Sequence, residues 1–132
     1  MLEHKHLIIH AQVNWNPGPQ DVHEMTKWLR RLVEEIDMKI LHGPVVIYSE
    51  AEGNVGMTGF VIIETSHIAF HHWVPEEGEE FGELQLDVYT CSTLDPMEVI
   101  QMLDIFEPES VAIKYLDREN GLTEIPYIFK EE

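Results

Sequence analysis

The chain has 132 residues and only one cysteine, Cys91. A single cysteine cannot form a disulfide within the chain, so a reducing compartment is the simpler expectation, and we predict a cytoplasmic protein. Long apolar stretches are also missing from the sequence, because none approaches the ~20 residues that a membrane helix needs. The first residues, Met-Leu-Glu-His-Lys-His, lack the layout of a secretion signal. These absences predict a protein without a membrane partner.

Basic residues are scarce as well. Eight Lys and Arg stand against 25 Asp and Glu, which gives a net charge of −17. Such a chain repels phosphate backbones, so nucleic acid is not an expected partner. The charge would attract a cationic small molecule or a basic partner, although acidity that serves solubility alone is the more common explanation.

Length and composition predict one folded domain, residues 1–132. Apolar residues make up 44% of the chain and charged residues 25%, which is enough to bury one core. Alternating apolar residues predict a strand over Lys5–Val13. Asp21 and Glu24 resemble a capping box for a helix that ends near Lys39. Six residues form the predicted buried stripe of this helix: Met25, Trp28, Leu29, Leu32, Val33 and Ile36.

The rest of the chain is predicted to be mostly strands. His42–Pro44 is expected to break the chain, and Ser49–Gly59, with its glycines, is expected to be a loop. Asp95 and Pro96 mark the start of a second helix, which Pro108 ends. The predicted strands are Val45–Tyr48, Phe60–Ile63, Ile68–Trp73, Leu84–Cys91, Ser110–Leu116 and a short one around Tyr127–Phe129. This order favours an α+β two-layer sandwich, a mostly antiparallel sheet with two helices on one face.

Histidines suggest a metal site at first sight. His67, His71 and His72 lie within six residues, yet on a strand His67 and His71 are about 13 Å apart at about 3.3 Å per residue. His71 and His72 point to opposite faces of the sheet. His4 and His6 are better spaced, but histidines near a terminus are more often simply solvated. We therefore predict no metal site.

Nucleophilic chemistry is the other possibility. Ser66, the histidines after it and Cys91 supply a hydroxyl, potential bases and a thiol that an antiparallel sheet could bring together. Each residue also has a purely structural explanation: Ser66 as a turn serine, His71 as a half-buried strand residue and Cys91 as a small core residue. Composition alone favours the structural explanations.

Two motifs alter that balance. Residues 64–76 read Glu-Thr-Ser-His-Ile-Ala-Phe-His-His-Trp-Val-Pro-Glu, and residues 86–91 read Leu-Asp-Val-Tyr-Thr-Cys. Together they resemble the signature of the prokaryotic S-adenosylmethionine decarboxylases, which have Glu-Ser-His, then His-Thr-Trp-Pro-Glu, and later Asp-Val-Phe-Thr-Cys-Gly. The resemblance extends to residues 6–9, 56–59 and 95–96 and spans most of the chain in the same order.

This resemblance implies a self-processing enzyme whose cofactor is a pyruvoyl group. The Ser66 hydroxyl would attack the carbonyl of Thr65, and elimination of the resulting ester would leave a pyruvoyl group at residue 66. That ketone would bind the substrate's amine and accept the electrons released with carbon dioxide. Cys91 would return a proton to the product, and His71 would assist processing.

The resemblance also implies the substrate contacts and the assembly. Trp73 matches an aromatic residue suited to stacking on adenine, and Glu76 matches a carboxylate that holds the ribose. Thr58 matches a serine that aids processing. The substrate would be S-adenosylmethionine or a related cationic amino acid. A homodimer is expected, because a second copy would cover the sheet face that the helices leave open.

Several residues depart from the family pattern. Thr65 replaces the glutamate before the cleaved serine, Thr58 replaces a serine, His72 replaces a threonine, Val74 is inserted and Ser92 replaces a glycine. Three alternatives therefore stay open: an unprocessed relative that acts as a ligand-binding or regulatory subunit, a pyruvoyl decarboxylase for another amino acid, and an acidic metal-binding module.

Overall fold

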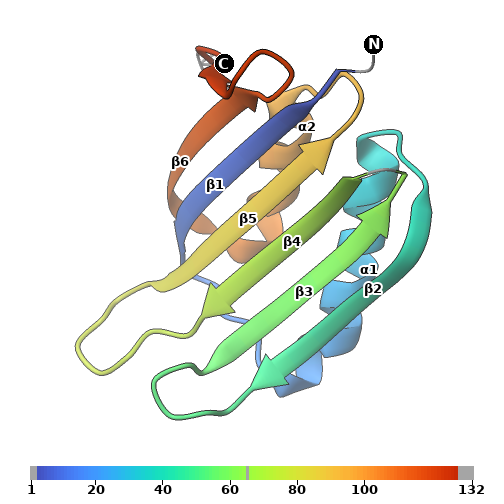
Figure 1. Ribbon diagram of the computed structural model, residues 1–132. Coiled ribbons are helices and arrows are strands. Elements are labelled where there is room, and N and C mark those ends of the chain that lie inside the picture. Colours follow the sequence, from blue (N-terminus) through green and yellow to red (C-terminus); the bar gives the residue numbers. More distant parts are fainter. Residues whose placement is uncertain (1–2, 65, 128–132) are drawn as a thin grey trace.

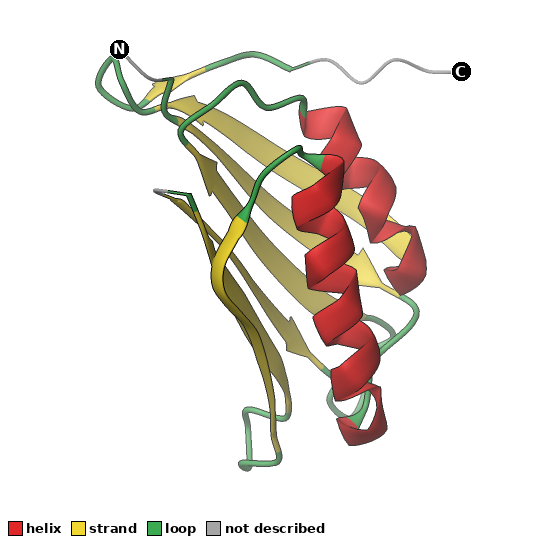
Figure 2. Ribbon diagram, turned by 90° about the vertical axis from the view of Figure 1, so that its right-hand side faces the viewer, coloured by secondary structure: helices red, strands yellow, loops and turns green. Residues whose placement is uncertain are grey.

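A computed structural model describes residues 3–64 and 66–127, and in them a seven-stranded sheet carries two helices on one face (Figures 1 and 2). The elements in chain order are β1 (Lys5–Val13), η1 (Pro19–Asp21), α1 (Val22–Glu35), β2 (Ile40–Ser49), β3 (Gly56–Ile63), β4 (Ser66–Trp73), β5 (Gly82–Thr90), α2 (Pro96–Gln101), η2 (Met102–Phe106), β6 (Pro108–Asp117) and β7 (Thr123–Glu124). The predicted α+β sandwich is confirmed.

The strands lie in the order β2-β3-β4-β5-β1-β6-β7, and every neighbouring pair is antiparallel. The first strand of the chain therefore sits inside the sheet, between β5 and β6 (Figure 1). Its residue Ile9 faces Leu86 on one side and Ile113 on the other. Pairing of β1 with β6 brings the first residues of the chain beside residues more than 100 positions away.

The core lies between the sheet and the helices. The predicted stripe of α1 is buried, and Trp28 is 1% exposed. Its ring packs edge-on against Phe70 and Phe106, with centroids 5.8 and 5.5 Å apart. The helix ends at Glu35, earlier than the predicted end near Lys39, because Asp37 adopts a left-handed φ of 57° that no helix can continue.

Both predicted helix starts are confirmed, but only one has the expected cap hydrogen bond. Asp21 directly precedes α1, yet its carboxylate accepts no hydrogen bond from this helix; instead it accepts the Gly18 N–H at 2.8 Å and closes η1. Asp95 does cap α2, because its carboxylate accepts the Met97 N–H at 3.0 Å, with Pro96 in the first turn.

Strands β2 and β3 are longer than predicted because Gly and Pro do not end them. Pro44 is tolerated in an edge strand, where the register shifts around His42. Gly56 and Gly59 are not turn residues but places of close approach: a Cβ on Gly56 would meet the His72 carbonyl oxygen, and one on Gly59 would meet the Phe70 ring.

The end of the chain also differs from expectation. After β6 the chain forms the short strand β7 at Thr123–Glu124, which pairs with β6. Tyr127 lies outside any strand, and the rest of the strand predicted around Tyr127–Phe129 falls outside the described residues. None of the helices in the described parts is long and apolar enough to cross a membrane.

The second face of the sheet carries no helix, and we call it the open face (Figure 2). In β4, Ser66 and every second residue after it are buried on the helix side, whereas His67, His71 and Trp73 lie on the open face. The open face also carries exposed apolar residues, namely Ile8 (36% exposed), Ile47 (65%), Phe60 (39%) and Ile62 (41%).

Candidate functional site

Ser66 is the first residue of β4 and is 7% exposed. Its hydroxyl donates a hydrogen bond of 3.0 Å to the backbone carbonyl of Glu64. Thr65, the other residue of the expected cleavage site, lies outside the described residues. Ser66 forms part of the wall of a cavity of about 570 Å³. The other lining residues are Leu41, Ile62, Ile63, His67, Tyr89 and Arg118.

Cys91 lies at the same end of the sheet. It follows β5, which runs antiparallel to β4 with Tyr89 opposite His67, so the end of β5 lies beside the start of β4. The Cys91 thiol is 3.7 Å from Nδ1 of His4, and the Tyr89 hydroxyl is 3.2 Å from the same nitrogen. The predicted nucleophile and the predicted thiol therefore share one end of the sheet.

Tyr89 is the centre of an aromatic and basic cluster beside the cavity. The His67 ring stacks on it with centroids 5.7 Å apart and planes at 14°. The guanidinium of Arg118 lies 4.5 Å from the ring centroid, within the range of a cation–π contact. None of His4, Tyr89 and Arg118 is a site residue predicted from the sequence. No local motif could have revealed the cluster, since strand pairing assembles it from distant parts of the chain.

Thr58, His71 and Trp73 form a second group, farther along β4 on the open face. Thr58 and His71 face each other across β3 and β4, and Oγ1 of Thr58 is 3.1 Å from Nδ1 of His71. The Trp73 ring stacks on His71 with centroids 5.9 Å apart, and its indole N–H donates to Asn54 at 2.9 Å. The two residues expected to aid processing thus contact each other.

Trp73 and Glu76 line a second cavity, of about 450 Å³. Its walls also include Glu52 and Glu77, so an aromatic ring and carboxylates surround one space. This combination suits an organic cation with a flat ring system, because the ring supplies a stacking surface and the carboxylates supply negative charge. Both residues that were expected to bind substrate are therefore found together.

The two groups are separated within one chain. Ser66 and His71 are five residues apart on β4, which is about 16 Å at about 3.3 Å per residue. Their side chains also leave the strand on opposite faces, as the burial pattern of β4 indicates. In the described chain, Ser66 and Cys91 lie at one end of the sheet. The group of Thr58, His71, Trp73 and Glu76 lies elsewhere, and the two groups are not close to each other.

His72 belongs to neither group. It points into the core, is 1% exposed, and its Nε2 lies 2.8 Å from the side-chain oxygen of Asn16. Burial lowers the pKa of His72 to about 4, so the ring is neutral at neutral pH. Within residues 3–64 and 66–127, no three His, Cys, Asp or Glu side chains meet in a way that could hold a metal ion.

The fold and the site together define a class of small α+β protein: a serine, Ser66, begins a central strand, and a cysteine, Cys91, follows the neighbouring strand. Comparison with known proteins identifies the family within this class. The sequence model of the family described as S-adenosylmethionine decarboxylase matches residues 5–119. The chain belongs to the S-adenosylmethionine decarboxylase family, a family of carboxy-lyases.

Individual relatives agree with this assignment. The S-adenosylmethionine decarboxylase proenzyme of Archaeoglobus fulgidus is 33% identical over 93 residues, which cover 68% of this chain and 78% of the relative. The proenzyme of the same name from Persephonella marina is 36% identical over 67 residues, which cover 48% of this chain and 45% of the relative.

A solved structure supports the fold. The crystal structure of the adenosylmethionine decarboxylase from Aquifex aeolicus superimposes on this chain with a TM-score of 0.62. The matched region covers 99% of this chain and 97% of the Aquifex chain. Sequence identity between the two is 17%, so this likeness concerns the fold alone.

Proposed function

We propose that this chain is a self-processing decarboxylase of S-adenosylmethionine whose cofactor is a pyruvoyl group made from Ser66. The observation that carries the proposal is the place of Ser66, which lines a cavity of about 570 Å³ at the end of the sheet where Cys91 also lies. A pyruvoyl group would stand at the start of β4 in place of Ser66, at the residue that lines this cavity.

Processing would begin at the Ser66 hydroxyl. Its oxygen attacks the carbonyl carbon of Thr65, and the acyl group moves from the Ser66 nitrogen to the oxygen. Loss of the Ser66 α-proton then expels residues 1–65 as a carboxylate. Water replaces the Ser66 nitrogen, which leaves as ammonia. The hydroxyl must first release the carbonyl of Glu64, a rotation about one side-chain bond.

In the decarboxylation, a pyruvoyl group at residue 66 would supply a ketone for the substrate's amine and an acceptor for the electron pair that carbon dioxide leaves behind. The residues of the chain do the rest. Cys91 donates the proton that replaces the lost carboxylate. Trp73 stacks on the adenine, and Glu76 accepts hydrogen bonds from the ribose hydroxyls. The net charge of −17 favours a substrate with a sulfonium cation over an anionic one.

A second copy of the chain would complete the site. The cavity at Ser66 has Ile62, His67 and Tyr89 in its wall, and these residues belong to the open face. Exposed apolar residues on this face favour contact with another apolar surface. Two open faces packed in opposite directions would bring His71 and Thr58 of one copy toward Ser66 of the other. We therefore propose a homodimer in which His71 and Thr58 assist processing across the interface.

The proposal extends to the setting of the reaction. Decarboxylated S-adenosylmethionine would supply aminopropyl groups to polyamine synthesis, as expected for this family. Residues 1–132 would act as a single domain. The single cysteine supports a cytoplasmic location.

Intact mass tests the central step. We expect the purified protein to separate under denaturing conditions into residues 1–65 and 66–132, the second fragment carrying a pyruvoyl group in place of the serine amine. Ser66→Ala should remain a single chain of 15.4 kDa, because no hydroxyl is left to attack. Cys91→Ser is the matched control, since it should cleave normally and yet lose most of its turnover, because no thiol returns the proton to the product carbon.

The second candidate is an unprocessed relative that binds a ligand. The hydrogen bond from Ser66 to Glu64 favours it, because this bond engages the attacking hydroxyl elsewhere. A single 15.4 kDa chain after prolonged incubation, stabilised against heat by S-adenosylmethionine, would support this candidate. Release of carbon dioxide from arginine or ornithine, but not from S-adenosylmethionine, would identify a decarboxylase for another amino acid.

A further inference from the structure

His4 lies against the proposed proton donor. Its Nδ1 is 3.7 Å from Sγ of Cys91 and 3.2 Å from the hydroxyl of Tyr89. An imidazole with its proton on Nε2 offers one lone pair on Nδ1 as an acceptor, so either the thiol or the phenol can donate to this atom. The His4 ring also stacks on Tyr89, with centroids 6.4 Å apart.

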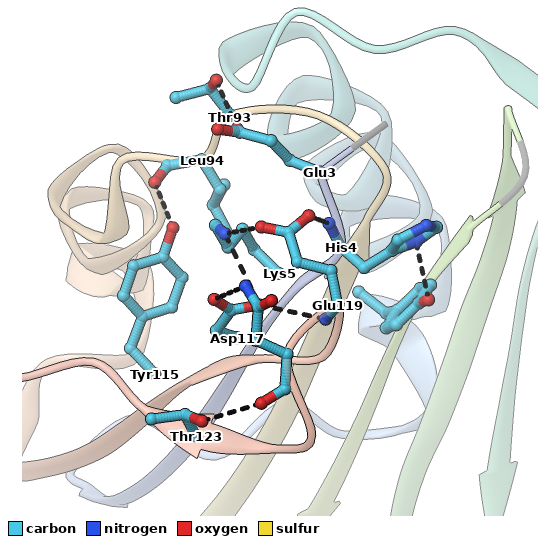
Figure 3. Close-up of polar contacts among 11 residues, drawn as sticks. Glu3, His4, Lys5, Thr93, Leu94, Tyr115, Asp117, Glu119 and Thr123 are labelled. Atoms are coloured by element: carbon cyan, nitrogen blue, oxygen red, sulfur yellow. Dashed lines mark hydrogen bonds and ion pairs between the residues drawn. The ribbon is translucent and has the colours of Figure 1, made fainter. Parts of the chain in front are cut away.

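His4 is held firmly although it is only four residues from the start of the chain. Its backbone N–H donates to Glu119 at 2.9 Å, and its carbonyl accepts the Arg118 N–H at 2.8 Å. The Lys5 ammonium binds the other oxygen of Glu119 at 2.6 Å and lies 3.8 Å from Asp117. Figure 3 shows this arrangement, with Lys5 between the two carboxylates and His4 directed away from them.

The anchoring has a consequence for chemistry. Both main-chain groups of His4 are fixed by residues that follow β6, and its ring stacks on Tyr89, so the ring lies beside Cys91. The hydrogen bond from Lys5 to Glu119 raises the pKa of Lys5. Lys5 therefore keeps its charge in the range in which an imidazole gains or loses a proton.

We propose that His4 is a positioning residue that exchanges a proton with Cys91 and so returns the thiol to its acid form after each turnover. This inference rests on the proposed decarboxylase function. When Cys91 gives its proton to the product carbon, a thiolate remains. His4, which has taken up a proton from water, passes it from Nδ1 to Sγ and becomes neutral. In each cycle one proton thus moves from solvent to product.

Cys91 is the only cysteine of the chain, so alkylation by iodoacetamide reports on its thiol directly, with or without catalysis. We expect His4→Gln to slow alkylation at pH 7 by about threefold or more, because the imidazole no longer accepts the thiol proton. The matched control is His10→Gln on β1, the strand that follows His4, since His10 binds Glu83 at 2.5 Å and is remote from Cys91. Its alkylation rate should match that of the unchanged protein.

The pH profile supplies a test that needs no substitution. In the natural protein, the alkylation rate should show an inflection in addition to that of the thiol, because a neutral imidazole accepts the thiol proton and a protonated one does not. His4→Gln should remove the inflection, and His10→Gln should keep it. A natural protein without this inflection, or a folded His4→Gln variant that is alkylated at the natural rate, would overturn the inference.

Measuring the decarboxylation rate of His4→Gln distinguishes failure of this inference from failure of the proposed function. If the chain is a decarboxylase, His4→Gln should cleave normally and lose about tenfold in kcat with little change in KM, because His4 acts through Cys91. A protein that never cleaves would refute the proposed function, while the alkylation data would still decide the pairing of His4 with Cys91. An active enzyme with unchanged alkylation and kcat in His4→Gln would refute this inference alone.

Discussion

His72 occupies an uncommon position for a histidine. Among the described residues, its Nδ1 is buried without a hydrogen-bond partner, while Nε2 lies beside Asn16. A neutral ring tolerates this environment better than a charged one, and burial accordingly lowers its pKa to about 4. The residue that replaces the family's threonine therefore makes folding sensitive to acid.

The pKa values of His72 in the folded and unfolded states determine how stability changes with pH. In the unfolded chain His72 takes up a proton below its ordinary value of 6.5, whereas in the folded protein it does so only near 4. The unfolded state thus binds more protons in this window, and stability falls as the pH drops from about 6.5 to about 4. The loss is on the order of 3 kcal/mol.

Urea unfolding at several pH values measures this effect. We expect His72→Gln to lose most of the pH dependence between pH 6.5 and 4 that the natural protein shows. The control is His23→Gln, which changes an exposed histidine on α1 and should keep the natural slope. Equal slopes in both variants would mean that His72 does not carry the effect.

At the scale of secondary structure, two glycines of β3 lie where a side chain would collide with β4. Gly56 lies against the backbone of His72, and Gly59 lies against the ring of Phe70. A backbone carbonyl in a sheet ladder cannot move aside without breaking the ladder, whereas a ring can turn slightly. The two glycines should therefore differ in how well they accept a side chain.

We expect Gly56→Ala to lower the free energy of unfolding by about 3 kcal/mol and Gly59→Ala by about 1 to 2 kcal/mol. Gln85→Ala, on an exposed position of β5, should change it by less than about 0.5 kcal/mol. Chemical denaturation measures all three. A Gly56→Ala variant as stable as Gln85→Ala would contradict the close approach of β3 and β4.

The same glycines explain what the sequence could and could not predict. Alternation and the helical stripe correctly indicated β1, β4, β5 and α1, because these elements bury one face regularly. Gly56 and Gly59 resembled turn residues, since a lack of Cβ signals either a turn or a close neighbour and only the fold decides which. Asp21 resembled a helix cap for a similar reason, because its carboxylate had a second donor nearby at Gly18.

The sequence likewise identified only the site residues that belong to local motifs. Ser66 and Cys91 could be identified from local motifs, and the structure brings them to one end of the sheet. His4 and Arg118 could not, because pairing of β1 with β6 joins residues more than 100 positions apart. Partners from distant strands leave no periodic trace in a sequence.

At the scale of the whole molecule, the open face carries exposed apolar residues on several strands, namely Ile8, Ile47, Phe60 and Ile62. Phe60→Asp places a charge on it, at a residue that is 39% exposed. We expect this change to raise the dissociation constant of the dimer at least tenfold, about 1.4 kcal/mol, because the charge would be buried between copies. Sedimentation measures the equilibrium.

Leu122→Asp provides the matched control for this test. Leu122 is 62% exposed in the turn between β6 and β7, which lie at the other side of the sheet from β3, the strand of Phe60. It should leave the dimer unchanged. A natural protein that is monomeric at all concentrations, or two variants that weaken association equally, would refute the proposed interface.

The order of strands has a last consequence for a chain cut between residues 65 and 66. Residues 1–65 would hold β1, β2 and β3, and residues 66–132 would hold β4 to β7, but β1 lies between β5 and β6. Three strand pairings would connect the two fragments: β1 with β5, β1 with β6, and β3 with β4. Cleavage would then create a new chain end, while the two fragments stay associated in one folded protein until a denaturant separates them.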